Sequence, residues 1–134
     1  MVFFDTNIFV YAVSTAGEDQ EKRRIARMLL AGEEFSLSLQ VVQEFINTCL
    51  NKARLGQSRE AIAQTVELLL AYPCLIPSTD LIRHSLALQG RYQISYWDAA
   101  VLAAAMELGC TKLYTEDLNH GQAYESVQVI NPFV

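Results

Sequence analysis

Short segments that are apolar or mix apolar and polar residues, as strands do, are interspersed along this chain with longer segments in which apolar residues repeat at helical spacing. The short segments have three or four residues each and cover residues 2–4, 35–38, 74–76, 112–115 and 127–130. The longer segments cover residues 8–13, 18–31, 41–50, 58–72, 78–89 and 96–108, and Gly32, Gly90 and Gly109 are expected to end three of them. Strands that alternate with helices are joined by crossovers, which make the strands parallel and cover both faces of the sheet. The sequence therefore predicts an α/β fold, a three-layer α/β/α sandwich with a short-stranded parallel sheet.

The composition is that of a folded chain, because 51% of the 134 residues are apolar and 19% are charged. A chain of this length buries about 68% of its unfolded surface, so we expect residues 1–134 to form a single domain. No apolar run approaches the roughly 20 residues that span a bilayer, so we expect no membrane partner. Cys49, Cys74 and Cys110 are odd in number and form no CxxC pair, which is typical of a reducing compartment and predicts a cytoplasmic location.

The charge balance is acidic, with 15 Asp and Glu residues against 10 Lys and Arg residues and a net charge of −5. This balance argues against binding nucleic acid through a general basic surface. It leaves open an enzyme that holds phosphate groups through a divalent metal ion, since such a site needs carboxylates. Two basic clusters fit either contact with an RNA backbone or a solvated helix face: Lys22, Arg23, Arg24 and Arg27, and Lys52, Arg54 and Arg59.

Four acidic residues stand at predicted strand ends or helix starts. Asp5 and Asp117 follow strands, whereas Glu44 and Asp98 lie near the beginnings of helices. In a parallel sheet these positions share one edge, which is where ligands of α/β proteins bind. Carboxylates that gather there repel one another unless a cation lies among them, and oxygen ligands suit Mg²⁺ or Mn²⁺.

Each acid also has a purely structural interpretation. Asp98 follows Ser95 at the spacing of a capping box, and Asp5 is a plausible N-cap. Glu44 fits an ordinary helix acid near a favourable dipole end, and Asp117 fits a turn. Position alone therefore does not decide between a metal site and four separate structural roles for these acids.

Four segments, in order along nearly the whole chain, resemble the PIN domain family of nucleases, which includes VapC-like toxin ribonucleases. They are Phe3-Phe4-Asp5-Thr6-Asn7, Val41-Val42-Gln43-Glu44-Phe45, Ser95-Tyr96-Trp97-Asp98-Ala99-Ala100 and Leu113-Tyr114-Thr115-Glu116-Asp117-Leu118-Asn119-His120-Gly121.

The resemblance implies a site and an activity. By position, Asp5, Glu44, Asp98 and Asp117 match the family's acidic metal-binding residues, and Asn7 and Thr115 match polar residues that orient them. Asn119 stands where the family often has a further acid, which puts a second metal ion in doubt. The implied function is a Mg²⁺-dependent endoribonuclease that cleaves RNA phosphodiesters through metal-activated water and acts as the toxin of a toxin–antitoxin pair. We accordingly expect RNA as substrate, an antitoxin protein as partner and a homodimer.

Three other functions compete with this interpretation. A non-catalytic PIN-like module that binds nucleic acid or protein would have the same fold. A phosphorelay receiver needs an acidic pair after the first strand, where only Asp5 stands, and a dehalogenase-like phosphatase needs an acid at Asn7. Trp97, beside a helix start, fits a base-stacking residue or, more commonly for such a position, a core residue.

Overall fold

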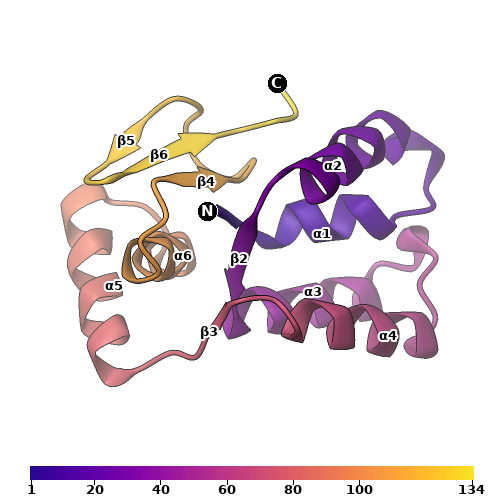
Figure 1. Cartoon of the computed structure of the whole chain (residues 1–134), viewed down its shortest axis with the longest axis horizontal. Helices are drawn as coiled ribbons and strands as arrows, with labels where there is room; N and C mark the ends of the chain where they lie inside the picture. The colour runs from indigo at the N-terminus through magenta and orange to yellow at the C-terminus, as the bar shows by residue number, and fades with distance from the viewer.

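The computed structural model describes all residues from Met1 to Val134 (Figure 1). The strands are β1 (Val2–Phe4), β2 (Phe35–Ser38), β3 (Cys74–Leu75), β4 (Lys112–Tyr114), β5 (Ala123–Tyr124) and β6 (Val127–Ile130). The helices are α1 (Thr6–Val13), α2 (Gln20–Gly32), α3 (Leu39–Asn51), α4 (Arg59–Leu70), α5 (Thr79–Tyr92) and α6 (Tyr96–Glu107), with 3₁₀ turns η1 (Gly17–Asp19) and η2 (Ala53–Leu55). None of the helices combines the length and the apolarity needed to cross a membrane.

The strands form one sheet in the order β3-β2-β1-β4-β6-β5. All neighbouring pairs are parallel except β5 and β6, which are antiparallel. The predicted α/β class is confirmed, but the expectation of a wholly parallel sheet is wrong at β5. That strand has two residues and pairs through a tight turn with Glu125 at φ 52°, so it is too short to leave a periodic signal in the sequence.

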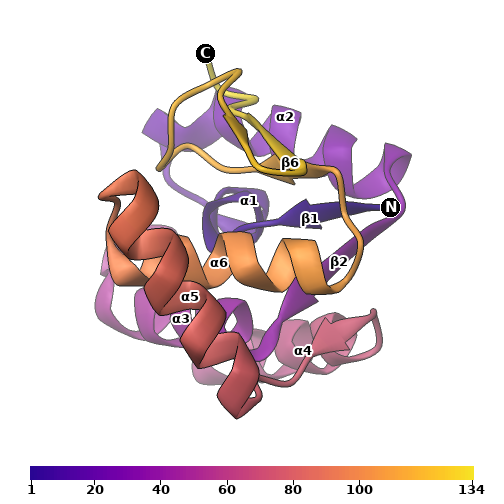
Figure 2. The ribbon, with the colours of Figure 1, turned by 90° about the vertical axis from the view of Figure 1, so that its left-hand side faces the viewer.

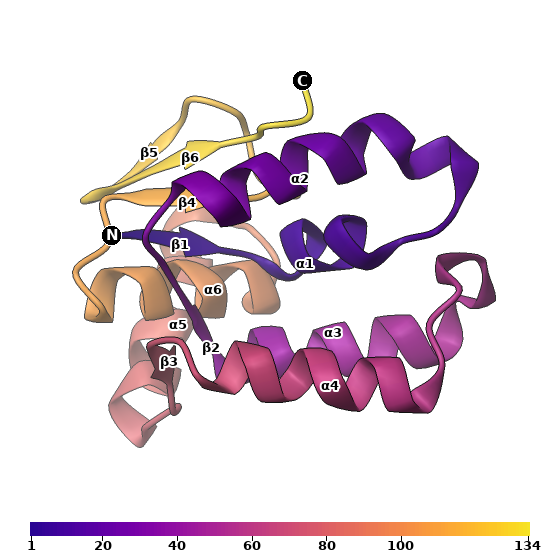
Figure 3. The same ribbon diagram turned by 45° about the vertical axis from the view of Figure 1, so that its right-hand side comes forward.

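Helices cover both faces of the sheet, as the crossover rule requires. Helices α5 and α6 lie on one face, and α1 and α2 lie on the other (Figures 2 and 3). Helices α3 and α4 lie side by side and extend away from the edge formed by β2 and β3 (Figure 3). Within the sheet, β2 and β3 lie on one side of β1, and β4 and β6 lie on its other side. The order therefore reverses at β1, and the crevice of this sheet lies beyond the ends of β1 and β4.

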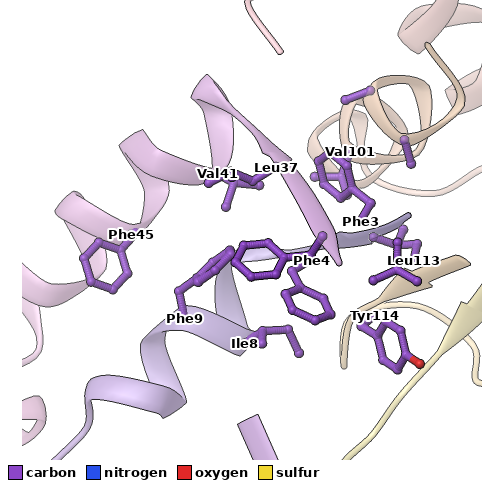
Figure 4. Packing of buried hydrophobic residues seen from close by; sticks show 14 of the residues in the cluster. Phe3, Phe4, Ile8, Phe9, Leu37, Val41, Phe45, Val101, Leu113 and Tyr114 are labelled. Carbon is purple, nitrogen blue, oxygen red and sulfur yellow. The ribbon is translucent and has the colours of Figure 1, made fainter. Parts of the chain in front are cut away.

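The core explains why β1 is apolar at every position. Phe4 stacks on Phe35 with ring centroids 4.8 Å apart and meets Tyr114 edge-on at 5.5 Å. Phe9 of α1 contacts the ring of Phe4 edge-on, with ring centroids 6.1 Å apart. Phe3 points to the opposite face, toward α6 (Figure 4). Both faces of β1 are buried, so the strand cannot alternate apolar and polar residues.

Four sequence expectations are wrong in detail. Helix α1 begins at Thr6 rather than at residue 8, because Asp5 caps it. Helix α5 continues through Gly90 to Tyr92, and Gln93, at φ 53°, takes the left-handed position that the glycine was expected to fill. Ile76 is 72% exposed and lies outside β3, and Trp97 is 63% exposed rather than in the core.

Candidate metal centre

Asp5 lies between β1 and α1, where two hydrogen bonds hold its carboxylate. Oδ1 accepts the backbone N–H of Thr6 at 2.7 Å, and Oδ2 accepts the hydroxyl of Thr115 at 2.8 Å. Asp5 is only 3% exposed. Burial raises the pKa of Asp5 from 3.8 to about 7, although both hydrogen bonds lower it, and the charges of Asp117 and Glu44 raise it further. The carboxylate is thus fixed in place but costly to ionise without a cation.

Asp98 and Asp117 approach Asp5 from two other elements. The hydroxyl of Ser95 caps α6 by accepting the backbone N–H of Asp98 at 3.0 Å, which places Asp98 in the first turn. Asp117 follows β4, the neighbour of β1. One carboxylate oxygen from each of Asp5, Asp98 and Asp117 lies within 4.8 Å of the other two. The three acids therefore meet at the crevice where the strand order reverses.

The pKa values of the two other acids also respond to this arrangement. Burial raises the pKa of Asp98, and the charge of Glu44 adds to the rise. Burial likewise raises the pKa of Asp117, with further increases from the charges of Asp98 and Glu116. All three carboxylic acids are harder to ionise than in water, chiefly because they are buried and secondarily because other negative charges lie near them.

Glu44, the fourth predicted ligand, lies near this cluster but not in it. Its Oε2 accepts the hydroxyl of Thr6 at 2.9 Å, and its Oε1 accepts the amide of Gln40 at 3.0 Å. The amide of Gln40 also donates to the backbone oxygen of Trp97 at 3.2 Å, linking α3 to α6. Glu44 thus contributes negative charge to the site while its carboxylate is held by side chains of α1 and α3.

Of the three predicted supporting residues, two contact the acidic cluster and one does not. Thr115 donates to Asp5 and accepts the backbone N–H of Asp117 at 3.1 Å. The amide nitrogen of Asn7 is 3.3 Å from both the Thr115 hydroxyl and Oδ2 of Asp117. Asn119 does not join them, because its amide donates to Gln122 at 2.9 Å. Thr115 and Asn7 therefore tie the two strand-end acids together.

Sequence reasoning missed Thr6, Gln40 and a second group of side chains beside Asp117. The hydroxyl of Tyr11 donates to Glu116 at 2.6 Å, and the ammonium of Lys22 is 3.1 Å from the other oxygen of Glu116. Lys22 also lies 4.6 Å from the centre of the Tyr11 ring. The four-residue spacing of Gln40 and Glu44 on a helix is a signal that would have found that pair. No local signal indicates the group around Glu116, whose members lie far apart in sequence.

A cavity of about 280 Å³ opens beside these residues. Thr6, Asn7, Tyr11, Glu44, Glu116 and Asp117 form part of its wall, and the end of α3 with η2 forms the rest. A substrate group that enters this cavity would reach Asp117 and Glu44.

The residues present fit a hard divalent cation. Three carboxylates, with no imidazole or thiol among them, offer the all-oxygen donor set of Mg²⁺ and Mn²⁺. A cation would also stabilise the ionised forms that burial and mutual repulsion disfavour. In addition, Oδ1 of Asn7 is buried without a hydrogen-bond partner. Mg²⁺ keeps several of its waters when it binds a protein, and a water is the kind of donor that this oxygen lacks.

Comparisons with known proteins agree with this geometry. The sequence model of the PIN domain family matches residues 2–125. A toxin–antitoxin complex from Klebsiella pneumoniae has a similar structure, with TM-score 0.71 and 22% identity over 99% of this chain and 98% of that chain.

Two further structures are similar at 18% identity. FitAcB from Neisseria gonorrhoeae has TM-score 0.69 over 99% of this chain and 99% of that chain. VapC20 of Mycobacterium tuberculosis, a toxin that cleaves the sarcin–ricin loop, has TM-score 0.68 over 84% of this chain and 87% of that chain. No curated protein sequence matches this chain. At these identities the structural likenesses establish the fold.

Proposed function

This chain belongs to the PIN domain family, and from that premise we propose that it is a Mg²⁺- or Mn²⁺-dependent endoribonuclease. The observation that carries the proposal is the approach of Asp5, Asp98 and Asp117 to within 4.8 Å of one another at the crevice of the sheet. Membership of the family also removes the receiver and phosphatase alternatives, whose folds carry different site patterns.

Each residue has a role in this proposal. Asp5, Asp98 and Asp117 hold the cation, and Thr115 and Asn7 fix the orientation of Asp5 and Asp117. Glu44, restrained by Thr6 and Gln40, adds the negative charge that draws a cation to the crevice. When bound, the ion activates water for attack on a phosphodiester and stabilises the charge of the in-line displacement. Because only three carboxylates gather and Asn119 is turned away, the geometry favours one tightly held ion.

A cleavage assay tests this function directly. Purified protein should cut single-stranded RNA with Mg²⁺ or Mn²⁺ and should stop in EDTA. Asp98→Asn should lose cleavage, whereas Glu107→Gln, an exposed acid at the other end of the same helix, should retain it. Equal cleavage by all three proteins, or cleavage that persists in EDTA, would identify a contaminant and refute the proposed site. Binding of RNA without cleavage would support the alternative, a non-catalytic binding module.

We further propose that the nuclease is the toxin of a toxin–antitoxin pair in the cytoplasm. The similar structure from Klebsiella pneumoniae is a toxin–antitoxin complex and VapC20 is a toxin, which supports an antitoxin protein as partner. Expression of the wild type alone should arrest growth, and expression of Asp98→Asn should not. Equal growth of the two strains would reject the toxin role and leave the nuclease activity to be judged by the cleavage assay.

A homodimer is the third part of the proposal, supported by exposed apolar residues on α5 and α6. Ile82 and Trp97 are 54% and 63% exposed and line one groove of about 270 Å³. Leu86, four residues after Ile82 on the same helix face, is 62% exposed. Large apolar side chains exposed close together are typical of an interaction site. Sedimentation should show a dimer for the wild type and a monomer for Leu86→Glu, and a wild-type monomer would refute this part.

A further inference from the structure

One face of α3 leads from the acidic site to a lysine. Glu44, Asn47 and Thr48 are spaced so that they share a face of the helix, and Lys52 is the C-cap residue that follows it. All four residues line the cavity beside Asp117. The eight residue steps from Glu44 to Lys52 correspond to about 12 Å along a helix axis. The cavity therefore has an acidic end near Asp117 and a basic end near Lys52.

Lys52 differs from most other cations of the chain because it has no partner. Five of the ten Lys and Arg residues form ion pairs: Lys22, Arg24, Arg54, Arg83 and Arg91. Arg23 and Arg27 donate to backbone carbonyls of Ser14 and Ala12. Of the three that remain, Lys52, Arg59 and Lys112, only Lys52 lines this cavity.

Two other charged residues of the cavity wall are already compensated. Arg54 also lines the cavity but is paired with Asp19. Glu116, which would repel an anion, is paired with Lys22 at 3.1 Å and accepts the hydroxyl of Tyr11. Lys52 is thus the one positive charge on this wall that no acid of the protein neutralises.

We propose that Lys52 binds a backbone phosphate of the substrate strand that neighbours the phosphate at the carboxylates. This inference rests on the proposed nuclease function and adds a binding subsite and a strand path along α3. A cavity of about 280 Å³ has room for about nine waters at roughly 30 Å³ each, so a phosphate and its hydration fit within it. Asn47 and Thr48, between the two ends, offer neutral hydrogen-bonding groups to the strand.

The competing role for Lys52 is local, since it is the C-cap residue of α3 and a cation is favourable at a helix C-terminus. That role concerns stability and does not affect the salt dependence of nucleic-acid binding. The affinity for a single strand falls as the salt concentration rises. Loss of one phosphate contact makes this fall of log K with log salt less steep by about 0.7. With 1 M salt as reference, this slope predicts affinity losses of about eightfold at 50 mM and about threefold at 200 mM salt.

The test measures RNA binding by fluorescence anisotropy in the cleavage-deficient Asp98→Asn protein with Mg²⁺, using a short labelled single-stranded RNA. Lys52→Gln should weaken binding by these factors, and Lys52→Arg should restore most of the affinity. Lys112→Gln is the matched control, because Lys112 is also exposed and unpaired but begins β4, at the end of the strand opposite to the one that Asp117 follows. In the active protein, Lys52→Gln should raise KM and leave kcat within about twofold.

The possible results separate this inference from the function on which it rests. A wild type that cleaves RNA, together with a Lys52→Gln variant that binds like the Lys112→Gln control, would overturn the phosphate subsite alone. A loss of affinity that is equal at both salt concentrations would also overturn it, because it would reflect altered folding. A wild type that neither cleaves nor binds RNA would refute the proposed function itself.

Discussion

Asp5 should make the metal-free protein less stable as the pH rises through neutrality. In the folded protein its pKa is about 7, whereas an unfolded chain returns it to about 3.8. Between these values the folded state holds a proton that the unfolded state has lost, so the free energy of unfolding falls as the pH rises. Above about pH 7, Asp5 is ionised in both the folded and the unfolded state, and the full loss of unfolding free energy is present. Asp5→Asn removes this titration.

The size of the effect follows from the two pKa values. They differ by about 3 pH units, and each unit corresponds to 1.36 kcal/mol, which gives a total of about 4 kcal/mol. The part that lies between pH 5 and pH 8.5 is about 2.7 kcal/mol. For a domain of this length it corresponds to about 8–11 °C in Tm. Asp5→Asn also loses the hydrogen bond from Thr115, but that loss is the same at every pH and cancels when slopes are compared.

The assay is a set of thermal melts in EDTA at pH 5 and pH 8.5 for the wild type, Asp5→Asn and the exposed control Asp80→Asn. The wild type and the control should lose about 8–11 °C more than Asp5→Asn between the two pH values. At pH 8.5, Mg²⁺ at about ten times its Kd should restore about 1.4 kcal/mol to the wild type, because it binds the ionised site. Parallel pH profiles for the wild type and Asp5→Asn would refute the claim that burial of this carboxylate governs its titration.

Three further predictions concern the frame of the site. Ser95→Ala should lower stability by about 1 kcal/mol and weaken Mg²⁺ binding, since Ser95 caps the turn that carries Asp98; urea unfolding and metal titration check it. Phe4→Ala should cost about 3–5 kcal/mol of unfolding free energy, measured in urea. Gly56→Ala should lower the free energy of unfolding in urea by more than about 1 kcal/mol, because Gly56 has φ 68° and a Cβ there would lie 2.1 Å from the Thr15 hydroxyl. Adding Thr15→Ala should recover only the part of this loss that comes from the clash with Thr15.

Local signals predicted the elements well where a cap or a regular repeat marks them. Ser58, Ser78 and Ser95 stand at predicted helix starts, and each caps its helix through its side chain. The strands β1 and β2 were predictable because Val2–Phe4 is a continuous apolar run and Phe35–Ser38 alternates apolar and polar residues. Elements without such marks were missed, including β5, which has only two residues and exists through its pairing with β6. The left-handed residue that ends α5 could not be identified, because Gln93 rather than a glycine adopts it.

The candidate site shows the same division. Position after a strand or at a helix start predicted Asp5, Asp98 and Asp117, and the parallel sheet brings them together. The same reasoning placed Glu44 among them, but its carboxylate is held by Thr6 and Gln40. Spacing fixes the backbone position of an acid, whereas the direction of its carboxylate depends on partners from other elements.

The sequence by itself determined the alternation of strands and helices, the caps and the set of acids at one edge of the sheet. These properties depend on residues that are neighbours along the chain, so they can be deduced from spacing and residue type. Only the tertiary structure decided that Trp97 is exposed, that Glu116 is neutralised by Lys22 and that Lys52 is left without a partner. It also decided the pKa of Asp5, because burial by segments distant in sequence sets the cost of its charge.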